Sequence, residues 1–405
     1  MSGLGMSGLE IWGVTPIING SGTVTRLGGA PMPAAVVDAF VAATRQWAPL
    51  EQVQAVASRR IAAATGAEAG IVTAGSAAAL TLGAAAILAG DDLSRMEKLP
   101  QADGFPNEFL VAREQRSGYD HAVRAAGARL VEVGFNEQTA GAGVRRTELW
   151  EFAAAYSPLT AGVLYVALDD SRPPLDELIA WAHDRELPVL VDAAGELPPV
   201  KNLRSFIDLG ADLVCFSGGK AIRGPQATGI LCGRRPLVGS AALQMLDMDD
   251  HYELWDPPIE LIDKADFAGM PRHGVGRGLK VAKEQIAALL KALEMFSTGE
   301  YEKDDVRYRD ILQAIADQLA DAPVSCQLID GGDGRIPRLR IQLLASVDAA
   351  QRAMETCRRL RAGEPPIYLS HGELDRGALV VHPICLLDEH AAVIARRVRE
   401  EVSSV

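Results

Sequence analysis

Short, continuous runs of apolar residues alternate with segments of helical periodicity between residues 69 and 233. Fully apolar runs of this length are typical of strands buried on both faces, and intervening helices allow such strands to be parallel. The pattern therefore predicts an α/β fold built on a mainly parallel sheet. The runs are 69–73, 108–112, 128–133, 161–168, 187–192, 211–217 and 227–233. The last two are close enough in the sequence to pair antiparallel through the turn between them.

The chain divides by pattern into three segments. Residues 1–33 are irregular and rich in Gly and Pro, but they include Ile17 and Ile18, so we expect an ordered N-terminal arm that lies against a partner subunit. Residues 34–280 form the large domain. Residues 281–405 comprise a linking helix, whose apolar periodicity runs over 279–296, and a small α+β C-terminal domain.

Charge and composition exclude several classes of partner. The formal net charge is −13, which gives no overall electrostatic attraction to nucleic acid or to an anionic membrane. No apolar run approaches the roughly 20 residues that span a bilayer. The first residues lack the basic and apolar regions of a signal peptide, so we expect a cytoplasmic protein. Five scattered cysteines without a CxxC pair, and dispersed histidines, predict neither a disulfide framework nor a metal site.

The most informative residues follow two of the predicted strands. Asp192 ends the run 187–192, Ser217 ends the run 211–217, and Lys220 follows Gly218 and Gly219 in the turn. A lysine in such a turn can form a Schiff base with an aldehyde, and an aspartate at a neighbouring strand end can keep a pyridine nitrogen protonated. This pair predicts pyridoxal 5'-phosphate (PLP) as the cofactor. The plain alternatives are a solvated surface lysine and an aspartate that caps a helix.

A third point of contact for the same cofactor follows the first predicted strand. Gly75 and Ser76 open a small-residue helix over 75–90, with Ser76 as the expected N-cap. The N–H groups at a helix start bind a phosphate dianion, although many helices begin with Gly-Ser for capping alone. Beside Asp192, the small side chains of Ala193 and Ala194 leave room for a flat ring.

Other candidates are weaker. Gln115, Arg116 and Tyr119 lie where a loop can cover the cofactor ring, and the alternative is helix capping with Tyr119 in the core. A basic segment before the linking helix offers groups for a substrate carboxylate or phosphate, and ordinary linker charge is the alternative. The candidate substrate-binding residues are Arg272, His273 and Arg277 from this segment, and Asn19 and Arg26 from the arm.

Taken together, these motifs resemble a known group, the selenocysteine-synthase-like branch of fold-type I PLP enzymes, and within it proteins similar to D-glucosaminate-6-phosphate ammonia-lyase. The resemblance covers nearly the whole chain. It is most specific at 210–234, around Lys220, and is supported by the segments 18–29, 65–79, 119–134, 191–199 and 275–294.

The resemblance implies the fold-type I PLP-dependent transferase architecture and a homodimer or higher homo-oligomer with shared active sites. It implies Lys220 as the cofactor lysine, Asp192 at the pyridine nitrogen, and Ser217 with Gly75–Ala77 at the phosphate. One departure stands out, because the family often has a histidine before the arginine in the ring-covering loop, and this chain has Gln115. Selenocysteine synthases also carry a further N-terminal region for tRNA. The short arm and acidic chain therefore predict a small amino-acid-like substrate.

The reaction we expect is that of a lyase. Removal of the α-proton by Lys220, followed by loss of a β-hydroxyl, would convert a β-hydroxy amino acid or an amino-sugar acid to a 2-oxo acid and ammonia. Racemisation and aldol cleavage use the same residues and remain alternatives. Selenium transfer, transamination and a non-catalytic protein on a PLP scaffold are more distant ones.

Overall fold

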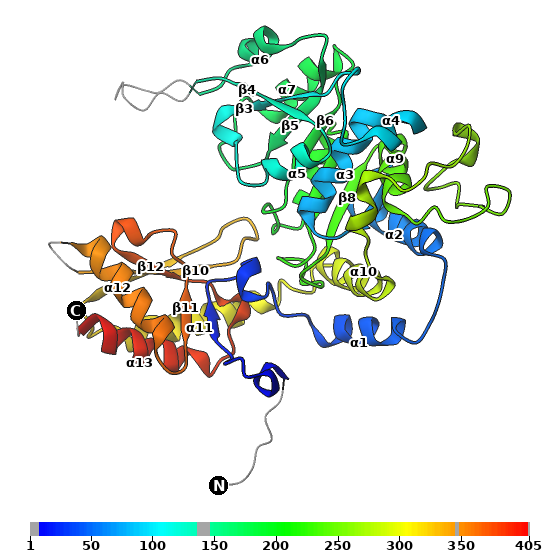
Figure 1. Ribbon diagram of the computed structural model, residues 1–405. Helices are drawn as coiled ribbons and strands as arrows, with labels where there is room; N and C mark the ends of the chain where they lie inside the picture. The colour runs from blue at the N-terminus through cyan, green and yellow to red at the C-terminus, as the bar shows by residue number, and fades with distance from the viewer. Residues whose placement is uncertain (1–7, 136–145, 345–347, 404–405) are drawn as a thin grey trace. The chain divides into compact units, whose positions relative to one another are not determined.

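The computed structural model describes residues 8–135, 146–344 and 348–403, and the chain forms two units (Figure 1). The large unit is Met32–Thr298, and the small unit combines Met1–Pro31 with Gly299–Val405. The N-terminal arm therefore belongs with the C-terminal part of the chain.

A mixed, mostly parallel sheet forms the centre of the large unit, with the strand order β2-β8-β7-β6-β5-β3-β4. All neighbours are parallel except β8, which runs antiparallel to both β2 and β7. The predicted α/β class and the antiparallel pairing through the lysine turn are both confirmed. The strands are β2 (Ala69–Thr73), β3 (Glu108–Ala112), β4 (Arg129–Val133), β5 (Thr160–Val166), β6 (Val189–Asp192), β7 (Leu213–Ser217) and β8 (Gly229–Gly233).

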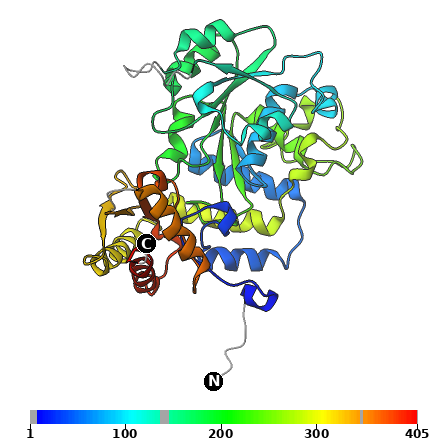
Figure 2. The ribbon, with the colours of Figure 1, turned by 60° about the vertical axis from the view of Figure 1, so that its left-hand side comes forward.

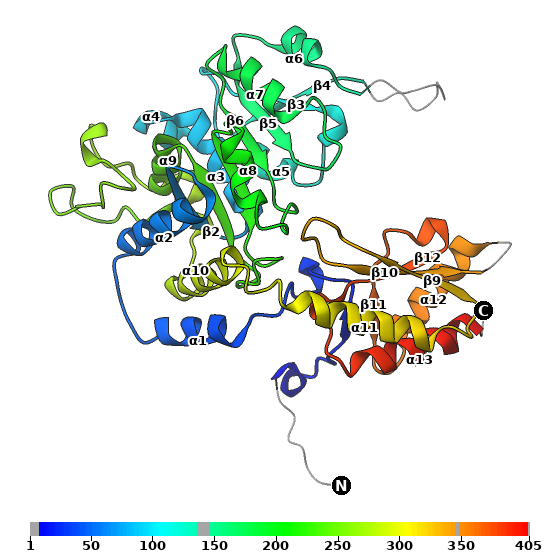
Figure 3. The same ribbon diagram turned by 180° about the vertical axis from the view of Figure 1, so that it is seen from behind.

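Helices cover both faces of this sheet. Figure 1 shows α3 (Ser76–Ala89) and α5 (Asp120–Ala125) on one face, where α9 (Arg235–Met245) also packs, while α7 (Leu175–His183) and α8 (Asn202–Asp208) lie on the other (Figure 3). Figure 2 shows the twist of the sheet between these layers. The short helices α4 (Leu93–Lys98) and α6 (Leu149–Ala155) lie beside α3 and β4.

Helix α3 is the central element of the core. It is apolar on all sides, as a fully enclosed helix must be, and its residues from Ala78 to Ala89 are buried except Ile87, which is partly buried. Gly83 lets it approach the sheet, because a Cβ there would lie 2.9 Å from the side chain of Leu190 in β6. Despite such apolar helices, none in the described part of the chain is long and apolar enough to cross a membrane.

The long helix differs from its prediction in start and in placement. It is α10 (Lys283–Ser297), because Val275–Leu279 forms a separate 3-10 turn and Lys280 is extended. It packs on α1 (Ala34–Ala43) and α2 (Leu50–Thr65) of the large unit, whereas the sequence pattern predicts a helix that links the two domains from residue 281.

The small unit is α+β, as predicted. Its antiparallel sheet has the order β12-β10-β9 and encloses an apolar core with three helices. These elements are β9 (Val324–Ile329), β10 (Arg338–Leu343), β12 (Ala378–Val381), α11 (Asp304–Gln318), α12 (Ala349–Ala362) and α13 (His390–Ser403).

A short strand ties the arm to the small unit. Strand β1 (Ile18–Gly20) pairs in parallel with β11 (Ile367–Leu369), and the apolar side chains of both strands enter the core of the unit. This described part of the arm is therefore ordered and lies on its own chain.

Gly229 offers a direct test of the packing between β8 and α3. A Cβ at this position would lie 2.4 Å from the carbonyl carbon of Gly75 and 2.6 Å from the nitrogen of Ser76, both backbone atoms. We expect Gly229→Ala to lower the free energy of unfolding in urea by about 1–3 kcal/mol. Gly118→Ala, where a Cβ meets nothing within 4 Å, is the control. Equal stability of the two variants would contradict this account.

Candidate functional site

Three strand ends and one helix start meet on the sheet of the large unit. Asp192 is the last residue of β6 and pairs with Cys215 of β7, while Ser217 ends β7 and pairs with Gly229 of β8. Lys220 lies three residues beyond Ser217, in the turn between β7 and β8. The structure therefore brings Asp192, Ser217 and the lysine turn to one edge of the sheet.

The lysine turn is closed by backbone contacts that exclude larger residues. The N–H of Gly218 donates to the carbonyl of Thr228 at 2.9 Å, and the N–H of Gly224 donates to the carbonyl of Gly218 at 2.8 Å. A Cβ on Gly219 would lie 2.5 Å from the Cα of Gln226. The glycines before Lys220 are thus required by packing, and they hold a half-buried lysine at a fixed place on the chain.

Asp192 is a buried carboxylate with one oxygen occupied. Its side chain is 9% exposed. Its Oδ1 accepts hydrogen bonds from the backbone N–H of Ala194 at 3.1 Å and from the thiol of Cys215 at 3.4 Å. Within the described residues, Oδ1 accepts both hydrogen bonds of this side chain, which leaves Oδ2 open to a ligand. A carboxylate oxygen that is open to a ligand suits a cationic N–H donor, because charge-assisted hydrogen bonds are the strong ones.

Cys215 is a contributor that the sequence reasoning did not identify. Its pattern indicated a reduced core cysteine, and the structure adds the hydrogen bond to Asp192. Burial, and then the charge of Asp192, raise the pKa of this thiol well above its ordinary value. The group therefore stays protonated and acts as a neutral donor to the carboxylate.

The start of α3 lies beside Ser217. Gly229, which pairs with both Thr73 and Ser217, is in close contact with Gly75 and Ser76. Helix α3 begins at Ser76 with Gly75 as its N-cap at φ 92°, and no side chain caps it. The expectation that Ser76 is the N-cap is therefore wrong by one residue, because the chain turns through the left-handed glycine.

The uncapped helix start fits a phosphate group. Gly75 and Ser76 are half-buried and Ala77 is exposed, so a ligand can reach the first turn. Its free N–H groups, the helix dipole and the hydroxyl of Ser217 would all favour a dianion. With the spare oxygen of Asp192 and the amine of Lys220, the residues present match the phosphate, ring nitrogen and aldehyde of PLP.

Gln115 has its amide committed to the backbone. It is 3% exposed, its Oε1 accepts from the N–H of Val166 at 3.0 Å, and its Nε2 donates to the carbonyl of Arg172 at 3.2 Å. It therefore ties the end of β5 to the following loop. Arg116 pairs with Asp120 and Glu132, and the neighbouring Tyr119 is 58% exposed rather than in the core.

The basic segment before α10 already has internal partners. Arg272 forms an ion pair with Glu97 at 2.9 Å, His273 lies 3.4 Å from Asp249, and Arg277 pairs with Asp247. The ligand atoms of Asp247, Asp249 and His273 lie within 4.8 Å of one another. All three residues are exposed and each of them is in one of these ion pairs, so we assign no metal site to them.

The two arm candidates lie in the small unit. Asn19 is buried and organises its own loop, because its Nδ2 donates to the carbonyl of Gly22 at 3.0 Å and its Oδ1 accepts from the N–H of Ser21 at 3.0 Å. Arg26 lies against the ring of Tyr368 and borders a cavity.

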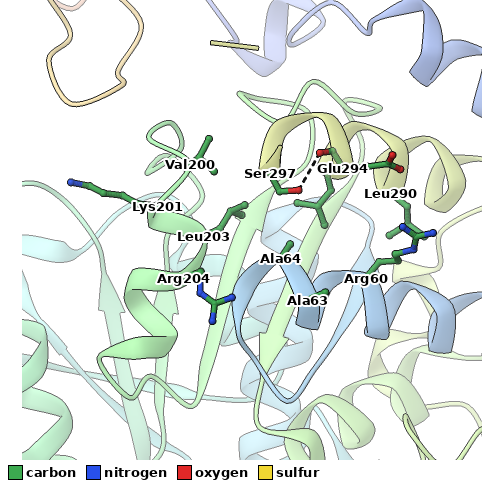
Figure 4. A pocket seen from close by; sticks show the side chains of 11 residues that line it. Arg60, Ala63, Ala64, Val200, Lys201, Leu203, Arg204, Leu290, Glu294 and Ser297 are labelled. Carbon is green, nitrogen blue, oxygen red and sulfur yellow. Dashed lines mark hydrogen bonds between the residues drawn. The ribbon is translucent and has the colours of Figure 1, made fainter. Parts of the chain in front are cut away.

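A separate groove of about 400 Å³ lies between α2, α8 and α10 (Figure 4). Figure 4 shows Arg60 and Lys201 at opposite ends of it, with Leu203 between them and the backbone carbonyl of Glu294 accepting from Ser297. Its lining includes none of the residues predicted for the cofactor or substrate.

Comparison with known proteins agrees with this geometry. The class-V aminotransferase family profile matches residues 171–257, the segment that holds Asp192 and Lys220. A Streptomyces protein named 5'-C-glycyluridine monooxygenase-decarboxylase is 30% identical over 400 residues, covering 96% of this chain and 90% of its own. The D-glucosaminate-6-phosphate ammonia lyase of Salmonella typhimurium is 25% identical, covering 96% of both chains.

A solved structure of a D-glucosaminate-6-phosphate ammonia-lyase superposes with a TM-score of 0.78 and 24% identity, over 98% of both chains. The fold, the cofactor geometry and the relatives agree. The chain is a PLP-dependent enzyme, and it belongs to the selenocysteine-synthase-like branch of fold-type I, in the family of D-glucosaminate-6-phosphate ammonia-lyase-like proteins.

Proposed function

We propose that this enzyme is a lyase that takes a β-hydroxy amino acid or an amino-sugar acid to a 2-oxo acid and ammonia. One observation carries the proposal. The turn of Lys220, the spare oxygen of Asp192 and the open start of α3 come from neighbouring ends of one sheet. The relative named as an ammonia lyase supports the choice of reaction.

Each residue has a defined role in this proposal, and Lys220 serves first as base and then as acid. PLP, when bound, supplies an aldehyde for the substrate amine and a ring that withdraws electrons from the substrate Cα. The first turn of α3 and Ser217 bind the phosphate, and Asp192 keeps a proton on the ring nitrogen. Lys220, released when the substrate amine takes its place, accepts the α-proton. The same ammonium then donates a proton to the departing β-hydroxyl, which leaves as water. That water is returned when ammonia is released, so the net reaction yields only the 2-oxo acid and ammonia.

The Streptomyces relative supports a second candidate. The name of this relative describes oxygenation with loss of CO₂, and the relative is 30% identical to this chain. Decarboxylation requires the carboxylate, rather than the α-hydrogen, to stand perpendicular to the cofactor ring. The residues proposed for the cofactor are compatible with either orientation, so product analysis has to separate the two reactions.

The first test is a substrate screen on the PLP-loaded protein. Incubation with β-hydroxy D- and L-amino acids and amino-sugar acids should release ammonia and a 2-oxo acid from one hand of one compound, with no uptake of O₂. Lys220→Ala should lose both the turnover and the near-visible absorbance of the lysine-bound cofactor, while the exposed Lys98→Ala should keep both. Aldehyde, inversion alone, or O₂ uptake with CO₂ would instead identify an aldolase, a racemase or an oxygenating decarboxylase, and would overturn the lyase.

Cys215 is expected to act through Asp192 as a positioning residue. Loss of its hydrogen bond in Cys215→Ala should cost about 1 kcal/mol, which is roughly a fivefold fall in kcat. KM should change little, and the cofactor absorbance should titrate at a shifted pH. Cys215→Ser keeps a donor and should recover part of the loss.

The matched control is Cys232→Ala, since this thiol is also buried but donates to the carbonyl of Val214 instead. An equal loss of kcat in Cys232→Ala, or an unchanged cofactor titration in Cys215→Ala, would mean that Cys215 only fills space.

We also propose that the enzyme is a homo-oligomer in the cytoplasm. The 3-10 segment Gly8–Trp12 exposes Leu9, Ile11 and Trp12, and α1 buries only Val36. Trp47, after α1, is 88% exposed. Apolar surfaces of this kind mark protein contacts, and a second copy of the chain is the occupant that shared active sites require. The five cysteines are free, as expected in a reducing compartment.

Light scattering of the purified protein tests the assembly. We expect a mass of at least two chains, and Trp12→Ser or Trp47→Ser should shift it toward one. Trp150→Ser, at an exposed position on α6, is the control and should leave the mass unchanged. A wild-type protein with the mass of a single chain would exclude the oligomer.

A further inference from the structure

The small unit contains a cavity of about 800 Å³ on the side of α12 that borders the arm. Its wall includes Arg26 from the arm, Cys357 and Arg361 from α12, and His371 and Leu374 from the segment after β11. All of these residues belong to one unit, so the cavity is defined within it. Its volume is in the range of small-molecule sites.

Two guanidinium groups meet at one aromatic ring beside this cavity. The Cζ of Arg26 lies 5.8 Å from the centre of the Tyr368 ring, and the Cζ of Arg361 lies 5.2 Å from it. Both charges also act on the thiol of Cys357, where they oppose the rise in pKa that burial causes. Like charges repel each other, and an anion bound near both groups would relieve that repulsion.

Arg26 and Arg361 lack the carboxylate partners that neighbouring arginines have. On α12, Arg358 and Arg359 both pair with Glu355, at 2.6 and 2.7 Å. Among the described residues, no carboxylate lies within ion-pair distance of Arg26 or Arg361. The Nε of Arg361 is moreover buried without a hydrogen-bond acceptor.

An unsatisfied buried donor costs about 1–3 kcal/mol of stability, so an acceptor that binds to the Nε of Arg361 would remove this cost. The exposed Asp375 also borders the cavity, and its single negative charge does not balance the two arginines.

We propose that this cavity is an anion-binding site, which takes a carboxylate or phosphate group of a small molecule through Arg26 and Arg361. Paired guanidinium forks match the geometry of such oxyanions, and partial burial strengthens the interaction relative to a surface pair. The source of the anion is either the acidic end of the substrate or a separate small effector. The site is argued from the small unit alone and does not depend on the lyase reaction.

Calorimetric titration of the PLP-loaded full-length protein with inorganic phosphate tests this site. The cofactor's own phosphate occupies the start of α3, which removes that competing position. At constant ionic strength in chloride buffer, we expect saturable binding that weakens at least tenfold in Arg26→Gln and in Arg361→Gln. Arg361→Lys keeps the charge but loses the fork, and it should fall between them.

The control is Arg396→Gln, which removes the same charge from α13 of the same unit and does not border the cavity. Far-ultraviolet circular dichroism and the melting temperature show whether each variant is folded. The proposal fails if phosphate does not saturate a site in the folded wild type, or if the control weakens binding as much as the two cavity variants do.

Kinetics separate the two sources once a turnover assay exists. Phosphate that competes with the substrate identifies the cavity as the place of the substrate's acidic end. Phosphate that binds and changes kcat without competing, or has no effect on turnover, identifies a separate ligand. Since binding is measured without turnover, a failed lyase assay leaves this test intact.

Discussion

The contact between the first residue of β8 and the first turn of α3 holds the site together. Strand β8 inserts antiparallel between β2 and β7, and a Cβ on its Gly229 would lie 2.4–2.6 Å from backbone atoms of Gly75 and Ser76. Because only glycine permits this approach, the helix start is pressed against the end of the sheet beside Ser217. The same antiparallel insertion requires a tight turn after β7, and that turn carries Lys220. One packing constraint thus sets both the start of α3, where we propose the phosphate, and the position of Lys220.

Two buried aspartates near β7, Asp212 and Asp192, differ in how many of their carboxylate oxygens accept hydrogen bonds from the protein. Asp212, just before the strand, is 2% exposed and satisfied on both oxygens by the N–H of Val189, by His183 and by Arg234. Asp192, at the opposite end of the sheet, receives two neutral donors from the described part of the chain, both on Oδ1. Buried charges are normally paired, so a carboxylate without a cation among these residues is a candidate for ligand binding.

The sequence predicted most of the architecture because its signals are local. Apolar runs and glycine boundaries predicted both ends of β2 and β3 correctly, and the short turn that carries Lys220 predicted the antiparallel pairing of β7 with β8. The pairing of β1 with β11 was missed, since three-residue strands far apart in the chain leave no periodicity. The short helices α4 and α8 were missed for the same lack of signal. The hydrogen bond from Cys215 to Asp192 could not be read from the sequence, because it depends on strand register.

The arginines before α10 and the arginines of the small-unit cavity differ in what they can offer to an anion. Arg272 has a side chain 89% exposed and already pairs with Glu97. A substrate carboxylate that recruits it exchanges one surface ion pair for another, and such pairs are worth only about 0–1 kcal/mol.

Arg361, by contrast, has a buried Nε without an acceptor and no carboxylate partner among the described residues. An anion at this place would accept a hydrogen bond from the Nε of Arg361, and no existing ion pair of Arg361 would have to break. An anionic ligand therefore gains more at the small-unit cavity that we propose than at the basic segment that the sequence first indicated.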